Sequence, residues 1–334
     1  MRAVILVGGF GTRLRPLTYA IPKPLLPVAH VPIVEHVVAN LARGGVTQAV
    51  LALGFKPDGF RAAYPNGTCA GVELVYAVEP EPLDTAGAIA FAARFAGIDD
   101  TFVVANGDVL TDLDVARLVT FHREHGGEGT IHLTPVEDPS AFGVVPTDED
   151  GRVRAFIEKP PRDTAPTNLI NAGTYVLEPG VIGRIPEGRK VSIERVTFPA
   201  LVADRALYAM PTDDYWLDLG KPEPYLQANL DVLDGRRAHL RIAGVATGAT
   251  VDPAAVVTRS VVAASAVVAA GARLTDSVVL DGSNVGEGAV VTRSILGPGT
   301  RVGPGAELTD VVTGEGTELA AGSHHAHCRI PEPD

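Results

Sequence analysis

The sequence contains little cysteine and no long apolar run. Among its 334 residues are only 2 cysteines, Cys69 and Cys328, which lie far apart and lack metal-ligand spacing. Such thiols suit a reducing compartment, so a disulfide is not expected. No run of about 18 uncharged apolar residues indicates a membrane span, and a strand-like run, Arg2 to Val7, follows Met1 without a signal-peptide pattern. We therefore expect a protein of the cytoplasm with no membrane partner.

Basic residues are also scarce. The chain has 28 Lys and Arg against 40 Asp and Glu, which gives a formal net charge of −12. Nucleic acids and anionic membrane surfaces both require clustered basic residues, so neither is an expected partner. An anionic substrate would have to be held by a few local cations and by backbone amides.

Regular secondary structure is predicted over most of the first 234 residues. Apolar residues make up 46% of the chain and charged residues 20%, as in folded globular proteins. Short β-branched runs alternate with helical patterns, which favours an α/β fold with a mostly parallel, Rossmann-like sheet. The expected strands are Ala3 to Val7, Ala49 to Leu53, Glu73 to Ala77, Thr101 to Ala105, Thr130 to Pro135, Val153 to Glu158 and Gly173 to Leu177. The expected helices are Ile33 to Arg43, Thr85 to Phe95, Leu113 to Glu124, Ser192 to Val202 and Pro222 to Leu233.

The composition changes beyond Leu240 to Val, Ala, Gly, Ser and Thr. Apolar residues recur there every six positions in two registers, interrupted at Arg273 and Asn284. This spacing predicts a parallel β-helix, and the alternative is a β-sandwich of short strands. We expect domains at residues 1–238 and 239–334, with the coil ends covered by the first domain or by a second subunit. The registers are Val261, Val267, Val279, Val285 and Val291, and Val278, Val290, Leu296, Val302 and Leu308.

A glycine-rich segment follows the first predicted strand. Gly8, Gly9 and Gly11 precede Thr12, and a loop with so few side chains lets backbone N–H groups approach phosphate oxygens. The loop is not a Walker motif, and it lacks the third glycine of a dinucleotide fingerprint. A purely structural turn is the alternative interpretation.

Two cations follow this loop within a proline-rich stretch. Arg13 and Lys23 are close to the glycines in sequence, and Pro16, Pro22 and Pro24 stiffen the segment that contains them. Cations near such a loop are suited to neutralising phosphate charge. In isolation, both would be ordinary surface charges.

Six short motifs, taken in order, resemble the nucleoside-diphosphate-sugar pyrophosphorylases, which are sugar-1-phosphate nucleotidylyltransferases. The resemblance covers the whole chain and implies transfer of a nucleotide to a sugar phosphate with release of pyrophosphate. It also implies a left-handed β-helix and a homo-oligomer formed through it. The motifs are Gly8 to Thr18 with Pro22 to Val28, Asn106 to Asp108, Phe142 to Val145, Glu158 to Pro160, Asn171 to Gly173 and Trp216 to Gly220.

The resemblance assigns roles to these motifs. Arg13 would stabilise the leaving pyrophosphate, Lys23 would contact the α-phosphate region and Lys159 the phosphate of the sugar. Asp108 and Asp218, at strand ends, are natural ligands for Mg²⁺, which takes few carboxylates and completes its shell with substrate phosphates; as plain turn residues they would be unremarkable. Sugar hydroxyls would be bound by Gly143, Glu158 and Asn171. The nucleotide would contact Leu6, Gly8, Gly9, Gly11, Thr12, Glu79, Asp84, Thr85, Asn106 and Gly107.

The choice of base is predicted from Glu79. A carboxylate accepts hydrogen bonds from both N1–H and N2–H₂ of guanine, whereas uracil and thymine present carbonyls that it repels. GTP is therefore the favoured nucleotide. Asp84 departs from the family, which usually has glycine before Thr85. If that position requires a positive φ, Asp is tolerated better than most residues.

The sugar is predicted from resemblance alone. Val191 to Arg195, followed by Phe198-Pro199, resembles the mannose-1-phosphate guanylyltransferases, which implies mannose 1-phosphate as substrate and GDP-mannose as product. The same chemistry on a glucose, heptose or cyclitol phosphate, or with UTP or dTTP, remains an alternative. A further alternative is a catalytically inactive subunit that binds nucleotide sugars and regulates a partner, although such a subunit would not need the cations and the metal pair.

Overall fold

The computed structural model describes residues 1–54, 57–237 and 239–333. The chain forms two compact units. The first consists of Met1–Gly9 and Val34–Trp216, and the second of Phe10–Ile33 and Leu217–Asp334. The glycine-rich segment is therefore divided between them. Gly8 and Gly9 belong to the first unit, and Gly11, Thr12 and Arg13 to the second.

A ten-stranded sheet forms the centre of the first unit, with strand order β11-β10-β12-β7-β1-β4-β6-β5 and with β9 between β12 and β13. The central strands β7, β1, β4 and β6 pair in parallel, whereas β12 runs antiparallel to β7. This arrangement confirms the predicted Rossmann-like sheet. The strands are β1 Arg2–Leu6, β4 Gln48–Leu53, β5 Thr68–Cys69, β6 Val72–Val78, β7 Phe102–Asn106, β9 Gly129–Pro135, β10 Gly143–Val144, β11 Ile157–Glu158, β12 Leu169–Leu177 and β13 Leu207–Pro211.

Helices connect and cover these strands. In α4 the Asp114 side chain accepts a hydrogen bond from Arg117 N at the start, and Gly126, with φ of 65°, ends the helix. The short strand β8 Val109–Thr111 precedes it. The helices and turns are α1 Ile33–Arg43, α2 Pro57–Ala63, α3 Asp84–Phe95, α4 Val115–His125, η4 Pro139–Ala141, η5 Arg162–Thr164, α5 Gly180–Gly183, η6 Ile193–Thr197 and α6 Phe198–Ala203.

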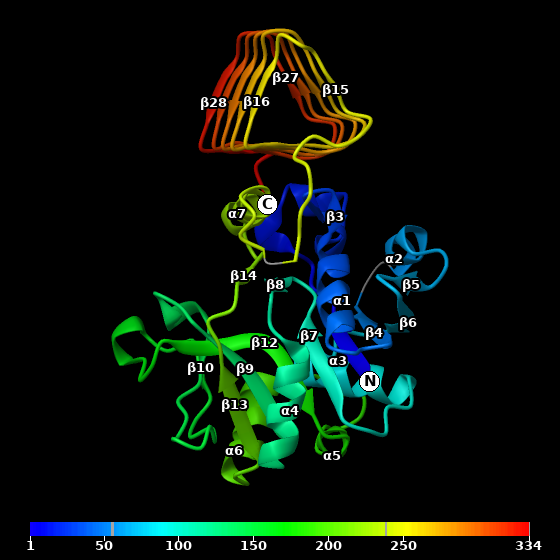
Figure 1. Cartoon of the computed structure of the whole chain (residues 1–334), viewed down its shortest axis with the longest axis vertical. Helices are drawn as coiled ribbons and strands as arrows, with labels where there is room; N and C mark the ends of the chain where they lie inside the picture. Colours follow the sequence, from blue (N-terminus) through cyan, green and yellow to red (C-terminus); the bar gives the residue numbers. More distant parts are fainter. Residues whose placement is uncertain (55–56, 238, 334) are drawn as a thin grey trace. The chain divides into compact units, whose positions relative to one another are not determined.

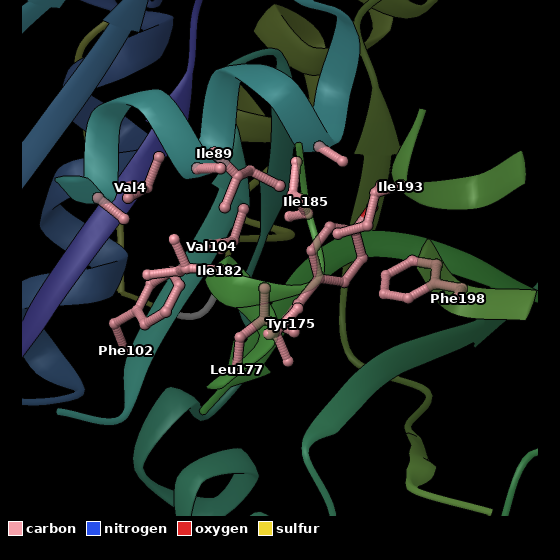
Figure 2. Packing of buried hydrophobic residues seen from close by; sticks show 14 of the residues in the cluster. Val4, Ile89, Phe102, Val104, Tyr175, Leu177, Ile182, Ile185, Ile193 and Phe198 are labelled. Carbon is pink, nitrogen blue, oxygen red and sulfur yellow. The ribbon is translucent and has the colours of Figure 1, made fainter. Parts of the chain in front are cut away.

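The core of the first unit lies between the sheet and these helices. Figure 2 shows Ile89 of α3 beside Val4 of β1 and Val104 of β7, all fully buried. Tyr175 of β12 meets Phe198 of α6 edge to face, with ring centroids 5.1 Å apart. Burial of this apolar surface is the main force that holds helix and sheet together, and it fixes the strand ends from which the site is built.

Two predicted elements differ from the structure. Val153 and its neighbour Arg152 form isolated bridges, and only Ile157–Glu158 of the predicted strand belongs to the sheet. The predicted helix from Ser192 begins as a π-helical turn, η6, before α6. Pro199 has no N–H to donate to Arg195, which disfavours a continuous α-helix at this point.

The second unit contains a parallel β-helix built from three five-stranded sheets. Figure 1 shows its coils as a stack of rungs with a triangular outline. The strands pair in parallel throughout, which confirms the predicted parallel β-helix and agrees with the left-handed form that the resemblance implies. They are β15 Thr250–Val251, β16 Val256–Thr258, β17 Val261–Val262, β18 Val267–Val268, β19 Arg273–Thr275, β20 Val278–Val279, β21 Asn284–Val285, β22 Val290–Thr292, β23 Ile295–Leu296, β24 Arg301–Val302, β25 Glu307–Thr309, β26 Val312–Thr313, β27 Glu318–Leu319, β28 His324–Ala326 and β29 Arg329–Ile330.

The coil length corrects the predicted register. Each strand pairs with the one 17 residues along, as Val262 pairs with Val279 and Val279 with Leu296. One side of each coil is a residue shorter than the other two, so a strict six-residue register drifts. Val261, Val267, Val278 and Val290 are therefore not the inward residues; the inward series is Val262, Val268, Leu274, Val279, Val285, Val291, Leu296, Val302, Leu308 and Leu319.

The exposed positions of Arg273 and Asn284 follow from the same register. Each lies just before an inward residue, Leu274 and Val285 respectively, so neither interrupts the core.

The segment with the two predicted cations packs within the second unit. Its elements are η1 Thr12–Leu14, η2 Leu17–Tyr19, η3 Lys23–Leu25, β2 Pro27–Val28 and β3 Val31–Pro32. Ala29 N donates to Asn229 Oδ1 at 2.8 Å, and Tyr225 Oη donates to Pro27 O at 2.5 Å. Both partners are on α7 Pro222–Leu233, which follows β14 Trp216–Asp218. This early segment therefore folds together with the residues from Leu217 onwards, which lie more than 180 residues later in the sequence.

No helix within residues 1–54, 57–237 and 239–333 is long and apolar enough to span a bilayer.

Candidate functional site

The candidate site of the first unit lies at the carboxyl edge of the parallel strands. Gly8 follows β1, Glu79 follows β6, and Asn106 ends β7. Because β12 is antiparallel to β7, the first half of β12, with Asn171, reaches the same edge. Ligands of open α/β sheets bind outside this edge of the strands.

Gly8 is in close contact with the backbone of Gly54, which follows β4. A Cβ on Gly8 would lie 3.0 Å from Gly54 N, and a Cβ on Gly54 would lie 3.1 Å from Gly8 O. Side chains at either position would push the two loops apart. The glycines therefore keep the end of β1 open at the backbone, as a phosphate-binding loop requires.

Glu79 places a buried carboxylate beside this loop. The residue is 8% exposed, and its Oε2 accepts a hydrogen bond from Leu83 N at 2.9 Å. Its Oε1 faces Gly8, 3.6 Å from the position that a Cβ would take. Burial raises the pKa of Glu79, and the hydrogen bond from Leu83 offsets part of this rise. One carboxylate oxygen is thus fixed by the protein while the other faces the glycine loop.

Asp84 and Thr85 form the start of α3. Asp84 has φ of 60°, the left-handed conformation that Asp tolerates better than most residues, and its Oδ1 accepts from Thr85 N at 2.8 Å. Thr85 Oγ1 donates to Glu194 Oε2 at 2.7 Å and accepts from Ile193 N at 2.8 Å. These bonds tie α3 to η6, so Thr85 has a structural role beside the binding role predicted for it.

Asn106 and Gly107 pack tightly against neighbouring strands. A Cβ on Gly173 of β12 would lie 2.6 Å from Asn106 Nδ2, so only glycine fits beside this amide. Gly107 N donates to Leu6 O at 2.9 Å, which joins the ends of β7 and β1. Asp108 follows directly and is thereby placed at the same edge.

The residues predicted to bind sugar phosphate gather around β10, β11 and β12. Gly143 pairs with Glu158, and Lys159 Nζ lies 3.4 Å from Glu158 Oε1. Lys159 N donates to Phe142 O at 3.0 Å although its own φ is 50°. Asn171 Nδ2 donates to Tyr175 Oη at 2.9 Å. Glu158 and Lys159 thus form an ion pair, and the lysine side chain is 60% exposed, so it remains accessible to an anion.

The second unit contains the remaining predicted residues: Gly11, Thr12, Arg13, Lys23 and Asp218. A Cβ on Gly220 would lie 2.9 Å from Arg13 Nη2 and 3.1 Å from Asp218 Oδ1, so the guanidinium and the carboxylate converge over this glycine. Gly11 has φ of 61° and accepts a hydrogen bond from Thr18 Oγ1 through its carbonyl, at 2.8 Å. A Cβ on Gly11 would be 3.1 Å from Lys23 Cβ.

The two predicted metal ligands lie in different units, Asp108 in the first and Asp218 in the second. Among residues 1–54, 57–237 and 239–333, no group of three or more His, Cys, Asp or Glu is arranged to hold an ion. Asp108 and Asp218 would offer one carboxylate each. Mg²⁺ binds in this way when substrate phosphates and water supply its other ligands, whereas structural zinc requires a full set of protein ligands.

Several contributing residues were not predicted from the sequence. Gly54 follows a predicted strand just as Gly8 does, so the pattern could have indicated it. Glu194 and Tyr175 orient Thr85 and Asn171, and their contacts join segments that are distant in sequence. Single-sequence periodicity does not reveal such contacts.

Sequence comparison finds two families in the chain. The family described as "Nucleotidyl transferase" matches residues 2–235, and the one described as "GMPPB C-terminal domain" matches residues 242–332.

Curated relatives share two fifths of the aligned residues. A protein of Mycobacterium tuberculosis named mannose-1-phosphate guanylyltransferase is 44% identical over 268 residues, which cover 78% of this chain and 74% of that protein. A protein of Hypocrea jecorina named mannose-1-phosphate guanyltransferase is 44% identical over 232 residues, 68% of this chain and 62% of that protein.

Among solved structures, HddC from Yersinia pseudotuberculosis superposes with a TM-score of 0.59 at 29% identity, covering 68% of this chain and 97% of that one. The same protein has been solved in complex with GMP-PN.

Proposed function

Because the chain belongs to the nucleotidyl transferase family, we propose that it is a sugar-1-phosphate guanylyltransferase, which converts GTP and mannose 1-phosphate into GDP-mannose and pyrophosphate. We assign the catalysis to residues 1–238, with residues 239–334 as the β-helix domain. The observation that supports GTP most directly is Glu79, a buried carboxylate with one oxygen turned towards the glycine loop.

The proposed reaction is an in-line displacement. An oxygen of the sugar phosphate attacks the α-phosphorus of GTP, a P–O bond forms there, and the bond to the β-phosphate breaks to release pyrophosphate. The attacking phosphate is already an anion at neutral pH, so no general base is needed. The protein's task is to bring two anions together and to neutralise the charge that accumulates.

The residues of this chain have separate tasks in that reaction. Gly8, Gly9, Gly11 and Thr12 would offer N–H groups to the triphosphate, and Arg13 would neutralise the departing pyrophosphate. Lys23 would contact the α-phosphate. Lys159, which is paired with Glu158 and largely exposed, would hold the phosphate of the sugar. Gly143, Glu158 and Asn171 would hydrogen-bond the sugar hydroxyls.

We propose Mg²⁺ as the cofactor, with Asp108 and Asp218 as its protein ligands. When bound, it would neutralise phosphate charge and align the triphosphate for attack. The family generally uses a divalent cation, and the two carboxylates fit magnesium for the reasons given above. We further propose that the enzyme works in the cytoplasm, and that it forms a homo-oligomer through the β-helix, because the ends of such a coil need to be covered.

Guanine recognition rests on the chemistry of Glu79. Its ionised carboxylate would accept from N1–H and N2–H₂ of guanine, a pair of donors that uracil and thymine lack. The complex of HddC with GMP-PN shows that a relative binds a guanine nucleotide. The curated relatives named for mannose 1-phosphate support that sugar as the second substrate.

Glu79→Gln tests the base assignment. The amide would present N–H to the donors of guanine, and loss of a hydrogen bond to a charged group costs about 1.5–3 kcal/mol. We expect KM for GTP to rise roughly ten- to hundredfold, with KM for UTP unchanged or lower. Glu81→Gln, at an exposed neighbouring position, is the matched control. Equal effects of both substitutions on GTP would remove Glu79 from base recognition.

A further inference from the structure

One face of the β-helix differs from the other two because most of its outward-pointing side chains are buried. Along the sheet β17-β20-β23-β26-β29, the first residue of each strand points away from the coil interior. In β17, β20 and β23 its neighbour belongs to the interior series, and the strand pairing carries the same register on to Thr313 in β26 and Ile330 in β29. In the first four strands these outward residues are nevertheless buried: Val261 at 2%, Val278 at 0%, Ile295 at 2% and Val312 at 9% exposed. Leu226 and Leu230 of α7 line one hollow together with Ile295 and Val312 of this face, so α7 of the second unit covers part of it.

The last strand of that face breaks the aliphatic series. Arg329 pairs with Val312 and occupies the same outward position one coil further. A half-buried arginine in place of an aliphatic residue requires hydrogen-bond partners, because its five N–H groups lose water when covered.

The partners of Arg329 are backbone carbonyls of the segment that contains Arg13. Nη1 of Arg329 donates to Arg13 O at 3.0 Å and to Arg15 O at 3.2 Å. One nitrogen of the guanidinium thus binds the carbonyls of the two residues that flank Leu14, the last residue of η1. Hydrogen bonds from a charged donor are roughly twice as strong as neutral ones.

A second contact from the β-helix lies directly beside the first. A Cβ on Gly314 would be 3.1 Å from Pro16 Cβ and 3.2 Å from Pro331 Cδ, so any side chain at this position would press on Pro16. Gly314 N donates to Ile330 O at 2.7 Å, which fixes this coil against the last strand. The last coils therefore hold Arg13, Arg15 and Pro16 at consecutive points.

The other end of Arg13 lies near the proposed metal ligand. Its guanidinium converges with the Asp218 carboxylate over Gly220, as described above. The backbone of Arg13 is fixed by Arg329, and the preceding carbonyl of Gly11 by Thr18. We propose that Arg329 is a positioning residue for Arg13, through which the β-helix sets the geometry of pyrophosphate departure. This inference rests on the function proposed for Arg13.

Arg329→Gln, compared with Arg301→Gln, tests this proposal. Arg301 is in the same β-helix, its side chain is 75% exposed, and its ion pair with Glu318 is long at 3.9 Å. A small misplacement of a catalytic group lowers turnover strongly, so we expect Arg329→Gln to lower kcat about ten- to hundredfold. In the reverse reaction with GDP-mannose, KM for pyrophosphate should rise by a similar factor. Arg301→Gln should leave both values unchanged, and both variants should remain folded at the assay temperature.

A double-mutant cycle separates positioning from general destabilisation. If Arg329 acts through Arg13, Arg329→Gln adds no further loss of kcat in an Arg13→Ala background. Losses that multiply in the double variant would overturn the proposal, as would a folded Arg329→Gln enzyme with wild-type kcat and pyrophosphate KM.

Two milder changes cover the case in which Arg329→Gln does not fold. Arg329→Lys keeps the positive charge, but its ammonium group can form a good hydrogen bond to only one of the two carbonyls. Gly314→Ala places a methyl group against Pro16 without changing any charge. Both should lower kcat and raise pyrophosphate KM, and wild-type values in both would reject the proposal. If the wild-type protein shows no turnover while folded, the proposed function fails and the role of Arg329 fails with it.

Discussion

Asp84 adopts a backbone conformation that most residues avoid. Its φ is 60°, and its side chain accepts from Thr85 N at 2.8 Å. Left-handed backbone costs an ordinary L-residue roughly 1–2 kcal/mol relative to glycine. We therefore expect Asp84→Ala to lower the free energy of unfolding by about that amount, and Asp84→Gly to change it little. Urea denaturation measures both, and equal stability of the two variants would contradict the strain argument.

Asp108 and Asp218 are the residues on which catalysis is expected to depend most. Asparagine keeps the shape and removes the negative charge that a hard cation requires. Asp108→Asn and Asp218→Asn should each abolish Mg²⁺-dependent pyrophosphate release while the thermal midpoint stays near the wild-type value. If both variants remained fully active, the metal assignment would be wrong.

Acidic pH should affect GTP binding through Glu79. Burial raises the pKa of this carboxyl, so it takes up a proton at a higher pH than an exposed glutamate does. Protonation removes an acceptor for the guanine N–H groups. We expect KM for GTP to rise as pH falls towards that pKa, and the pH profile of Glu79→Gln to lack this rise. An identical acid limb in both enzymes would exclude Glu79 as its source.

Single residues were predictable where the local rule holds. For Asp84, which stands where the family usually has glycine, the sequence raised a positive φ as a condition, and the structure has a φ of 60° there. Lys159 also has a positive φ, 50°, but it precedes Pro160, and a residue before proline favours extended backbone. Its conformation is imposed by the contact of Lys159 N with Phe142 O. Because Phe142 is distant in sequence, a local pattern could not reveal it.

Within the β-helix, serines form a ladder between coils. Ser277 N donates to Ser260 Oγ at 3.0 Å, and Ser294 N donates to Ser277 Oγ at 3.1 Å, each 17 residues along. Ser277→Ala removes the acceptor of a buried N–H, which costs about 1–3 kcal/mol. We expect that loss in the free energy of unfolding. Ser265→Ala should cost much less, because Gly282 N, which donates to Ser265 Oγ at 2.9 Å, is exposed and can bind water instead. Similar losses from both would show that coil stability does not depend on the ladder.

At the scale of elements, the spacing of apolar residues predicted the kind of secondary structure better than it predicted which residues of each strand face the core. The six-residue spacing indicated a β-helix, yet the coil of 17 residues follows from strand pairing, which spacing in short stretches does not determine. Strand β13, Leu207–Pro211, was not predicted at all. It is buried because it pairs in parallel with β9, more than 70 residues earlier. A contact between such distant segments cannot be predicted from the local hydrophobic pattern.

For the whole molecule, acid stability should depend on His132. This residue of β9 is fully buried, its Nε2 lies 2.8 Å from Thr212 Oγ1, and burial lowers its pKa from 6.5 to about 4. The unfolded chain thus binds a proton between these pH values that the folded chain does not. The contribution of neutral His132 to the free energy of unfolding is therefore complete above pH 6.5 and is lost as the pH falls towards 4.

His132→Gln tests this dependence. The shift corresponds to at most about 3 kcal/mol, and Gln stays neutral throughout. We expect the wild type to lose more unfolding free energy than His132→Gln between neutral pH and pH 4, with His239→Gln, an exposed histidine, behaving as the wild type. Parallel curves for wild type and His132→Gln would contradict the prediction.

The two-unit organisation has a consequence for the assembled enzyme. The segment with Arg13 and Lys23 folds with the β-helix and not with the strands that provide Glu79 and Asn106. The β-helix is therefore part of the unit that contains the two cations proposed to act in catalysis. The contacts through Arg329 and Gly314 are its direct link to them.

The central claim is tested most directly by pyrophosphate release with Mg²⁺ across GTP, UTP, dTTP, ATP and CTP, each with mannose 1-phosphate or glucose 1-phosphate. We expect strong turnover with GTP and mannose 1-phosphate alone, and loss of that preference in Glu79→Gln. Turnover with another pair would keep the reaction and replace the substrates. Folded protein that is silent with every pair would contradict guanylyl transfer to a hexose phosphate.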